Sequence, residues 1–411
     1  MDNQQEEKEN VKEIIIEKKS GFNYPEMIII MIIALLFGFL IGNIVSFTKG
    51  GSTTSSSSYT ELKELVDTYQ DIVDNYYEKV DKEKLIDAGI KGMISYLDDP
   101  YAGYLEGSSS EEFNQTLNGS YQGIGIEVVK NDTTITVTKV FDNSPAFKAG
   151  FKVGDIITKV SGEDVTNLAL DAVVELIKGN KTGTVDVQIM RDQKEQVLTV
   201  ARDTVDIPQV SSKVYTEGQE KVGYIKLEIF SANIAKQFKN EMKKLEEENI
   251  SRLIIDVRDN PGGYLTQVTE ILSLFMNKKQ VIYQLETKGV KEKIYGTSKK
   301  ATYQYPVVVL INKESASASE ILASAFKETY HSDIVGVSSY GKGTVQKTGD
   351  LNSGDTIKYT VQKWLTPKGN WINEKGVEPT KEVKLNLGIN ETLTDENDTQ
   401  LQKAIEVICS K

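Results

Sequence analysis

An uncharged stretch of 21 residues, Met27–Phe47, is the feature that most constrains this chain of 411 residues. A helix of that length spans a hydrocarbon core of about 30 Å. Four lysines precede it and fewer lie close behind it, a bias that places the N-terminus in the cytoplasm. A cleaved signal peptide is the alternative, but its apolar run is usually only about 7–15 residues. We therefore expect a single-pass anchor in the cell membrane, with residues 48–411 outside the cytoplasm.

The composition excludes several kinds of site before any motif is considered. The 48 basic and 60 acidic residues give a net charge of −12, whereas nucleic-acid-binding domains are basic. The single cysteine, Cys409, excludes an internal disulfide and CxxC motifs. The single histidine, His331, excludes a multi-histidine metal site. We expect no metal ion and no cofactor, and only His331 could supply a histidine base.

The parts on either side of the anchor differ in pattern. Residues 48–58 are rich in serine and predict a flexible tether. Residues 59–119 carry apolar side chains at helical spacing, among them Leu62, Leu65 and Val66, and predict a helical segment. We interpret this segment as an amphipathic packing or dimerisation element. The remaining expected parts are a cytoplasmic tail at 1–26, a β-rich domain at 120–205, an α/β core at 206–390 and a C-terminal segment at 391–411.

The β-rich part predicts a peptide-binding domain. Its short β runs are GIGIEVV, TITVTKVF, IITKV, VDVQIM and VLTV, with one helix near residues 168–177. SPAFKAGFKVGD resembles the PDZ domains, and YQGIGI resembles their carboxylate-binding loop. Backbone N–H groups in such a loop cap a terminal carboxylate, and the adjacent strand edge accepts an added strand. The alternative is that GIG is only a turn before a strand. The PDZ interpretation assigns the binding of peptide C-termini to Gly123, Ile124, Gly125 and Ile126.

Strands and helices alternate from residue 208 to residue 387, which predicts an α/β core. The expected strands LIIDV, VVVLIN and IVGV are followed by the loops RDNPGG, KESASA and SSYGKGTVQ. In open α/β sheets, ligand sites gather beyond the carboxyl ends of the strands. These three loops are therefore the candidate active site.

The residues alone leave two interpretations of Ser317 open. Ser317 and Glu320 fit the S-x-x-E pattern of a helix capping box, which is a structural role. A nucleophilic serine needs an adjacent base, and His331 lies at the far end of the expected helix, about 20 Å away. Lys342, between two glycines, is the remaining candidate, because burial lowers a lysine pKa and frees the amine. Its alternative is a solvated loop lysine.

The order of these motifs resembles the carboxyl-terminal processing (tail-specific) serine proteases, most closely their bacterial membrane-anchored, PDZ-containing branch. The resemblance covers residues 59–390. It implies a crotonase/ClpP-like α/β protease core with an inserted, mostly β PDZ domain, a helical segment and one transmembrane helix. The matching stretches are LDDPYAGYL, SYQGIGIEV, SPAFKAGFKVGD, VGYIKL, LIIDVRDNPGG, ESASASEILASAF, YGKGTVQ and TPKGNWINEKGVEP.

The resemblance also implies roles for individual residues. The oxyanion hole would use the backbone N–H of Ala318 and that of Gly262 or Gly263. Donors at a helix N-terminus suit this role, because they point at the negative charge that develops. The implied catalytic side chains are Ser317 as nucleophile, Lys342 as general base and Gln346 as the residue that orients the lysine.

Three positions depart from the family pattern. Glu314 precedes SASAS where a small residue is expected, and its carboxylate either perturbs a nearby lysine or points to solvent. SSYGKG replaces the more usual TFGKG, and GVEPT lacks the typical Pro-Asp. None of these changes touches Ser317 or Lys342.

We therefore expect a serine endopeptidase that forms an acyl-enzyme and cleaves extracytoplasmic proteins bound through apolar C-terminal tails. The expected partners are protein or peptide substrates, the membrane, and a second copy bound through the helical segment, but no nucleic acid. Family members remodel envelope proteins or cut signalling proteins. One alternative is an inactive PDZ scaffold, which the intact pair of Ser317 and Lys342 disfavours. Another is a crotonase-like acyl-chemistry enzyme, which leaves the attached PDZ domain unexplained.

Overall fold

The computed structural model describes residues 55–179, 182–386 and 391–410. The predicted anchor at 27–47 lies outside these ranges. Within them, no helix combines the length and the apolar character that crossing a membrane requires. The chain forms two compact units, and the boundary between them falls between Ile90 and Lys91.

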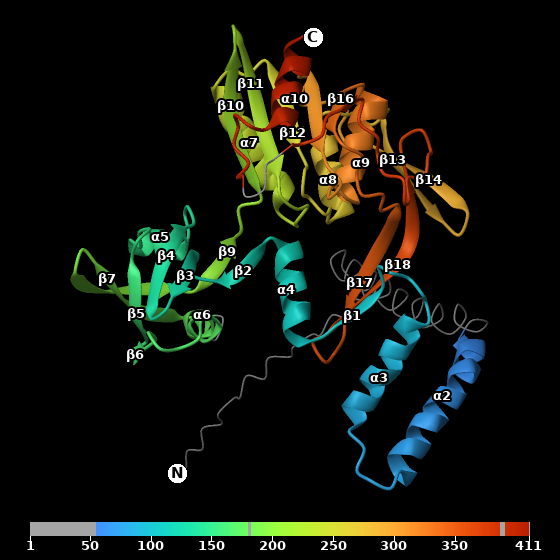
Figure 1. The fold of residues 1–411 in the computed structure, drawn as a ribbon. Coiled ribbons are helices and arrows are strands. Elements are labelled where there is room, and N and C mark those ends of the chain that lie inside the picture. Colours follow the sequence, from blue (N-terminus) through green and yellow to red (C-terminus); the bar gives the residue numbers. More distant parts are fainter. Residues whose placement is uncertain (1–54, 180–181, 387–390, 411) are drawn as a thin grey trace, which may run out of the picture. The chain divides into compact units, whose positions relative to one another are not determined.

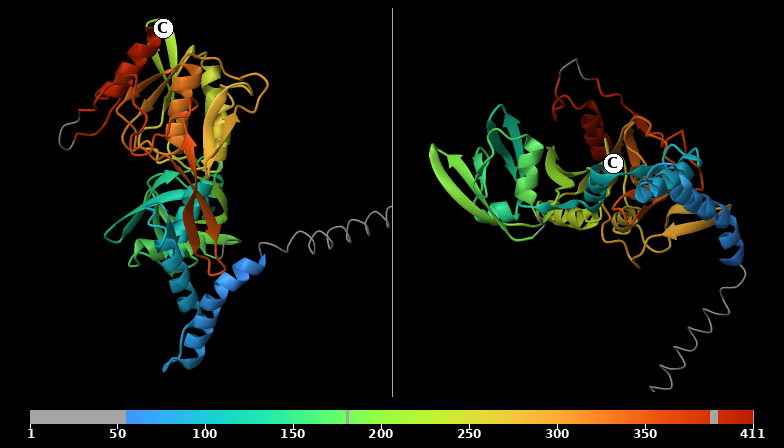
Figure 2. Two further views of the ribbon diagram at one scale, coloured as in Figure 1. Left: turned by 90° about the vertical axis from the view of Figure 1, so that its right-hand side faces the viewer. Right: turned by 90° about the horizontal axis from the view of Figure 1, so that it is seen from below.

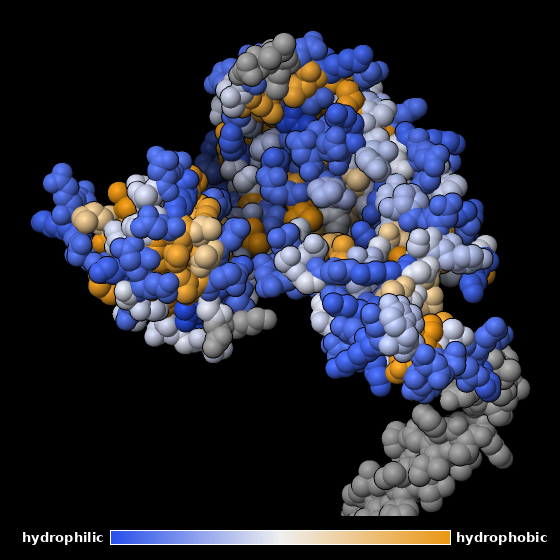
Figure 3. All heavy atoms as spheres, turned by 60° about the horizontal axis from the view of Figure 1, so that its bottom comes forward, coloured by the Kyte–Doolittle hydropathy of each residue, from blue (hydrophilic) through white to orange (hydrophobic). Residues whose placement is uncertain are grey.

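Helices make up the described part of the first unit, as the apolar spacing predicts. They are α2 (Ser55–Asn75) and most of α3 (Lys82–Ser95). Most of the predicted tether at 48–58 lies outside the described residues, and its last four residues belong to α2. Figure 3 shows apolar side chains among the hydrophilic ones on these helices. The large apolar side chains that α2 and α3 leave exposed in this unit are Leu62, Leu65, Val66, Ile72 and Ile86.

A β-rich domain occupies residues 120–206 of the second unit. The chain enters and leaves it through an antiparallel ribbon of β2 (Ser120–Gly123) and β9 (Asp203–Asp206). Between them lies a sheet of order β3-β4-β5-β7-β8, with β6 (Glu163–Asp164) paired to β5. Helices α5 (Pro145–Ala149) and α6 (Leu170–Lys178) contribute to its apolar core. The five strands are β3 (Ile126–Asn131), β4 (Thr134–Val140), β5 (Ile156–Val160), β7 (Thr184–Arg191) and β8 (Lys194–Ala201).

The α/β core is built on a second sheet, of order β10-β11-β12-β15-β16-β19. All neighbouring strands from β11 to β19 are parallel, and β10 is antiparallel to β11. Because these strands are buried on both faces, their sequences are continuous apolar runs. This pattern predicts β12, β15 and β16 correctly. The strands are β10 (Val210–Glu217), β11 (Glu220–Leu227), β12 (Arg252–Asp256), β15 (Val307–Ile311), β16 (Asp333–Gly336) and β19 (Lys381–Glu382).

Helices cover both faces of this sheet (Figure 1). Leu253 and Ile255 face α7 (Ile234–Glu247), α8 (Leu265–Leu272) and α9 (Ala318–Ala325), whereas Ile254 between them faces α10 (Thr399–Cys409). A short π-helix, η1 (Phe326–Tyr330), continues α9. The structure adds α10 in the C-terminal segment, for which the sequence pattern predicts no element.

A third sheet completes the core, with order β1-β18-β13-β14 and β17 paired to β18. Figures 1 and 2 show β17 and β18 as a long hairpin that reaches β1. Helix α4 (Gly107–Asn118) is attached beside it, because Ser110 Oγ and Thr356 Oγ1 share a hydrogen bond of 2.7 Å. The strands are β1 (Gly103–Leu105), β13 (Val281–Thr287), β14 (Val290–Tyr295), β17 (Thr344–Asp350) and β18 (Thr356–Leu365).

Candidate active site

The three loops singled out in the sequence meet at one edge of the core sheet. They follow β12, β15 and β16, which are parallel neighbours. The carboxyl ends of parallel neighbours lie at the same edge, so the loops are brought together by topology. Hydrogen bonds then join the loops, since the N–H of Ala316 donates to the carbonyl of Asn260 at 3.0 Å. The N–H of Tyr340 likewise donates to the carbonyl of Ser315 at 3.0 Å.

Ser317 occupies a strained position at the start of α9. Its φ is 54°, in the left-handed region that a residue with a side chain rarely adopts. Such strain persists only where the surrounding structure imposes it, and it gathers at functional sites. The predicted capping contact is present here, because the N–H of Ser317 donates to Glu320 Oε2 at 2.8 Å.

Glu320 does more than cap a helix. Its carboxylate is fully buried and accepts four hydrogen bonds. Burial raises its pKa above the ordinary value, although the four hydrogen bonds act in the opposite direction. The bonds tie the loop that carries Ser317 to the loop that carries Lys342. The donors are the N–H groups of Ser317, Gly341 and Lys342 and the hydroxyl of Ser339, at 2.6–2.9 Å.

The loop after β12 approaches Ser317 closely. A Cβ on Gly262 would lie 2.8 Å from Ser317 Cβ, and the φ of Gly262 is 103°, so only glycine fits. The N–H of Gly262 donates to Asn260 Oδ1 at 2.9 Å. Throughout the described ranges, neither the N–H of Gly263 nor that of Ala318 makes a backbone or side-chain hydrogen bond. Two backbone donors beside Ser317 are therefore free.

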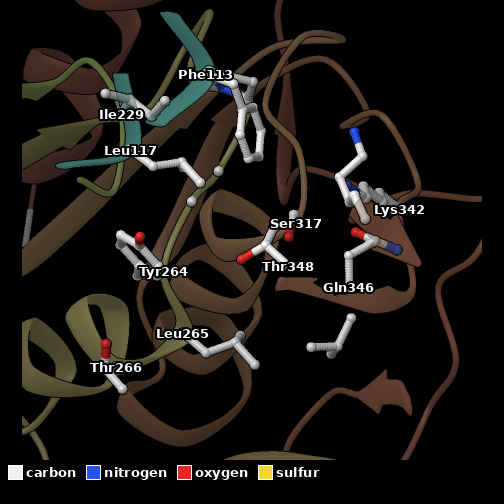
Figure 4. Close-up of a pocket in the computed structure, with 15 residues that line it drawn as sticks. Phe113, Leu117, Ile229, Tyr264, Leu265, Thr266, Ser317, Lys342, Gln346 and Thr348 are labelled. Carbon is white, nitrogen blue, oxygen red and sulfur yellow. The ribbon is translucent and has the colours of Figure 1, made fainter. Parts of the chain in front are cut away.

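Lys342 and Ser317 line the same cavity of about 390 Å³. Burial lowers the pKa of Lys342 to about 8, and the positive charge of Lys358 lowers it further, against the opposing charges of Asp99 and Glu320. In Figure 4 the amine of Lys342 points away from Ser317. Lys342 Nζ instead lies 4.8 Å from the centroid of the Tyr101 ring.

Gln346 lines the same cavity, on β17. Its amide Nε2 donates to Thr344 Oγ1 and Thr360 Oγ1, each at 3.0 Å. The structure thus brings all three predicted catalytic side chains into one pocket, without a hydrogen bond between them in the described part of the chain.

Much of the remaining lining is apolar, although Thr266, Thr348 and Lys358 also contribute to it. Figure 4 shows Phe113, Leu117, Tyr264 and Leu265 around Ser317, with Leu117 and Tyr264 on the side away from Lys342. The first two come from α4, and the last two come from the start of α8. Ile229 and Val345 add to the apolar lining. The pocket therefore presents an apolar recess, a hydroxyl and a buried amine side by side.

Comparison with known proteins shows which families this chain resembles. A model of peptidase family S41 matches residues 221–383, and a PDZ domain model matches residues 122–201. A model of the activating protease CtpB N-terminal domain matches residues 43–109. The chain is 43% identical to carboxy-terminal processing protease CtpB of Bacillus subtilis (strain 168) over 322 residues, which are 77% of this chain and 66% of that protein. It is 35% identical to carboxy-terminal processing protease CtpA of the same organism over 348 residues, 84% of this chain and 73% of that protein.

The chain belongs to the carboxy-terminal processing proteases of peptidase family S41. The resemblance to these proteases and to the PDZ domains is thereby confirmed, whereas membership of the membrane-anchored branch stays a prediction. Among solved structures, the photosystem II D1 C-terminal processing protease matches 78% of this chain and 92% of its own, with 24% identity and a TM-score of 0.44.

The PDZ domain of this protease places the predicted carboxylate-binding loop between β2 and β3. Gly125 has a φ of 88°, and a Cβ there would lie 2.3 Å from Ser144 Cβ, so the loop requires glycine. The carbonyls of Ile124 and Gly125 accept from Ala146 and Phe141 at 2.8 and 3.0 Å. β3 is the outermost strand of its sheet, and within the described residues it pairs only with β4. Its free edge has the form that an added peptide strand needs.

Two residues named in the sequence, His331 and Glu314, lie outside the cavity. His331 is exposed and follows the last residue of η1. It therefore lies at the far end of the helix that begins at Ser317, as the spacing predicts. Glu314 is exposed, so its carboxylate points to solvent, where its Oε1 lies 3.7 Å from the Nζ of exposed Lys313. Asn260 and Tyr101 are additions of the structure to the site, and they lie in the stretches RDNPGG and LDDPYAGYL that carry the resemblance.

Proposed function

We propose that this protease hydrolyses peptide bonds with Ser317 as the nucleophile and Lys342 as the general base. One observation carries the proposal: a strained serine shares an apolar cavity with a lysine whose pKa burial lowers to about 8. About a tenth of such an amine is neutral at pH 7, whereas a lysine of ordinary pKa near 10.4 is almost wholly protonated. A Ser-Lys pair is a known variant of the catalytic triad.

The steps follow from these groups. Neutral Lys342 takes the hydroxyl proton as Ser317 Oγ bonds to the carbonyl carbon of the substrate. The resulting ammonium gives that proton to the leaving amine as the C–N bond breaks, which leaves an acyl-enzyme. Water then repeats the two steps and releases the acid. Gln346 orients the lysine in this scheme, and the amine of Lys342 must first turn toward Ser317.

The oxyanion of each tetrahedral intermediate needs donors that are free before the reaction. Ala318 supplies one, at the N-terminus of α9. Of the two candidate glycines, Gly263 suits the second place better, because the N–H of Gly262 already donates to Asn260.

We further propose that the substrates are extracytoplasmic proteins whose free, apolar C-terminal tails bind at Gly123–Ile126 and add a strand to β3. In this proposal the core has the crotonase/ClpP-like fold, the predicted segment 27–47 anchors the enzyme in the membrane, and signalling proteins are among its substrates. Two copies would associate through the exposed apolar side chains of α2 and α3. Sedimentation would compare the mass of the full chain with that of a Leu65→Ser variant, and the variant should dissociate more readily.

An unfolded reporter with an apolar C-terminus tests the function. The full chain should cleave it, and Ser317→Ala should bind it without cleavage. The same reporter with a C-terminal amide should be cleaved at least tenfold more slowly, because a charge-assisted hydrogen bond to the carboxylate contributes about 1.5–3 kcal/mol. Tail binding without cleavage by the unmodified chain would instead identify an inactive scaffold. Equal rates for acid and amide would exclude the PDZ domain from substrate selection.

A further inference from the structure

The amine of Lys342 occupies a defined site apart from Ser317. Its distance of 4.8 Å from the Tyr101 ring centroid lies within the range of about 6 Å over which an aromatic face attracts a cation. Figure 4 shows that the side chain turns away from Ser317 to reach this position. In this arrangement the lysine cannot take the proton of the serine hydroxyl.

The Tyr101 ring is held by a turn that begins at Asp99. Asp99 Oδ1 accepts from the N–H of Tyr101 at 2.9 Å, and the carbonyl of Asp99 accepts from the N–H of Ala102 at 3.0 Å. Asp99 Oδ2 is buried and accepts no hydrogen bond from the described residues. A buried carboxylate oxygen without a donor favours a cation close by.

Charged groups from several elements influence whether Lys342 and its neighbours are ionised. Although burial raises the pKa of Asp99, the hydrogen bond from Tyr101 and the charge of Lys342 lower it below the ordinary value, so Asp99 is ionised. Asp99 and Glu320 favour the ammonium form of Lys342, and Lys358 disfavours it. Burial, Tyr340, Glu320 and Glu374 all raise the pKa of the Tyr101 hydroxyl above its ordinary value.

We infer that the turn Asp99–Tyr101 is a resting site for protonated Lys342, which holds the base away from Ser317 until the amine loses its proton. The inference rests on the proposed role of Lys342. Asp99 and Tyr101 are then positioning residues: they touch no substrate, and they set the pH at which the base becomes available.

Variants of this turn test the inference in the full chain through two readouts. The first is the pH dependence of kcat/KM on the tail-bearing reporter. The second is the pH dependence of Lys342 acetylation by acetic anhydride in a Ser317→Ala background, followed by mass spectrometry, which requires no activity. Tyr101→Leu and Asp99→Asn each remove a group that favours the ammonium. Both midpoints should therefore move to lower pH by about half a unit to one unit.

Matched variants separate positioning from general damage. Tyr101→Phe keeps the aromatic face, so its acetylation midpoint should stay at the wild-type value. Tyr96, which is 88% exposed, provides a control, and Tyr96→Leu should shift neither midpoint. If Tyr101→Leu does not fold, Asp99→Asn carries the test, because asparagine keeps the oxygen that accepts from Tyr101.

The outcomes distinguish this inference from the proposed function. Rates that fall equally at every pH in Tyr101→Leu and Asp99→Asn, with unmoved acetylation midpoints, would overturn the resting site and leave the base assignment intact. Substantial activity in Lys342→Ala would overturn the base assignment itself, whatever the Tyr101 variants do.

Discussion

The ionisation of Lys342 links the burial of one residue to the rate of the enzyme. Because only the neutral amine accepts a proton, a pKa of about 8 predicts that kcat/KM rises from pH 7 to pH 9 and reaches half its maximum near pH 8. Lys342→Arg should be inactive across this range, since arginine does not release its proton. His331→Ala, at an exposed position, should keep the wild-type profile. An active Lys342→Arg enzyme would show that another group is the base.

Glu320 is the residue on which the arrangement of the catalytic loops depends most. Its two oxygens accept from four donors, whereas glutamine offers one oxygen and two donors of its own. At least two donors would lose their acceptor, each at a cost of about 1.5–3 kcal/mol. We expect Glu320→Gln to lower the free energy of unfolding by about 3 kcal/mol. We also expect kcat/KM to fall about 100-fold through misplacement of Ser317 and Lys342.

Glu241→Gln is the matched control for that change. Glu241 lies on α7, and its hydrogen bonds within the described residues come from Ser212 and Lys244, neither of which is in a catalytic loop. Urea unfolding and reporter cleavage should both stay close to wild type in this variant. A Glu320→Gln enzyme with wild-type kcat/KM would mean that the loops hold their positions without the carboxylate.

At the scale of elements, the C-terminal helix α10 supports the loop that follows β12. Buried Arg258 in that loop makes two hydrogen bonds to Asp398, at 2.8 and 2.9 Å. Asp398 also caps α10 by accepting from the N–H of Leu401 at 2.9 Å. Arg258 keeps its ion pair with Asp256 at 2.6 Å in Asp398→Ala, so this variant loses charge-assisted hydrogen bonds and should lower the free energy of unfolding by about 1.5–3 kcal/mol.

Asp395→Ala provides the comparison for the α10 contact. Asp395 pairs with Lys213 at the surface, where an ion pair contributes about 1 kcal/mol or less. Urea unfolding of the two variants should therefore differ severalfold in free energy. Equal losses would show that Arg258 does not depend on α10.

For the whole molecule, the main expectation concerns its orientation in the membrane. The apolar stretch 27–47 and the lysines before it predict that everything after residue 48 lies outside the cytoplasm. Protease added to intact cells should therefore digest the PDZ domain and the core and spare an epitope placed in residues 1–26. A protected catalytic core with an accessible N-terminus would reverse the orientation.

The strands that carry the site and the family of the chain could both be predicted from the sequence. β12, β15 and β16 are continuous apolar runs followed by distinctive loops. Such a local pattern can be recognised without knowledge of the fold. The same holds for Ser317, Lys342 and Gln346, which the resemblance placed and the structure gathers into one cavity.

The contacts made around those residues could be found only from the folded structure. Arg258 meets α10 across 140 positions of sequence, and Glu320 meets Ser339 across 19, so no local pattern announces either contact. The resting position of Lys342 over Tyr101 likewise joins two stretches that the chain keeps far apart. The physical reason is that burial and charge depend on which segments fold together, and these two quantities set the pKa of the lysine.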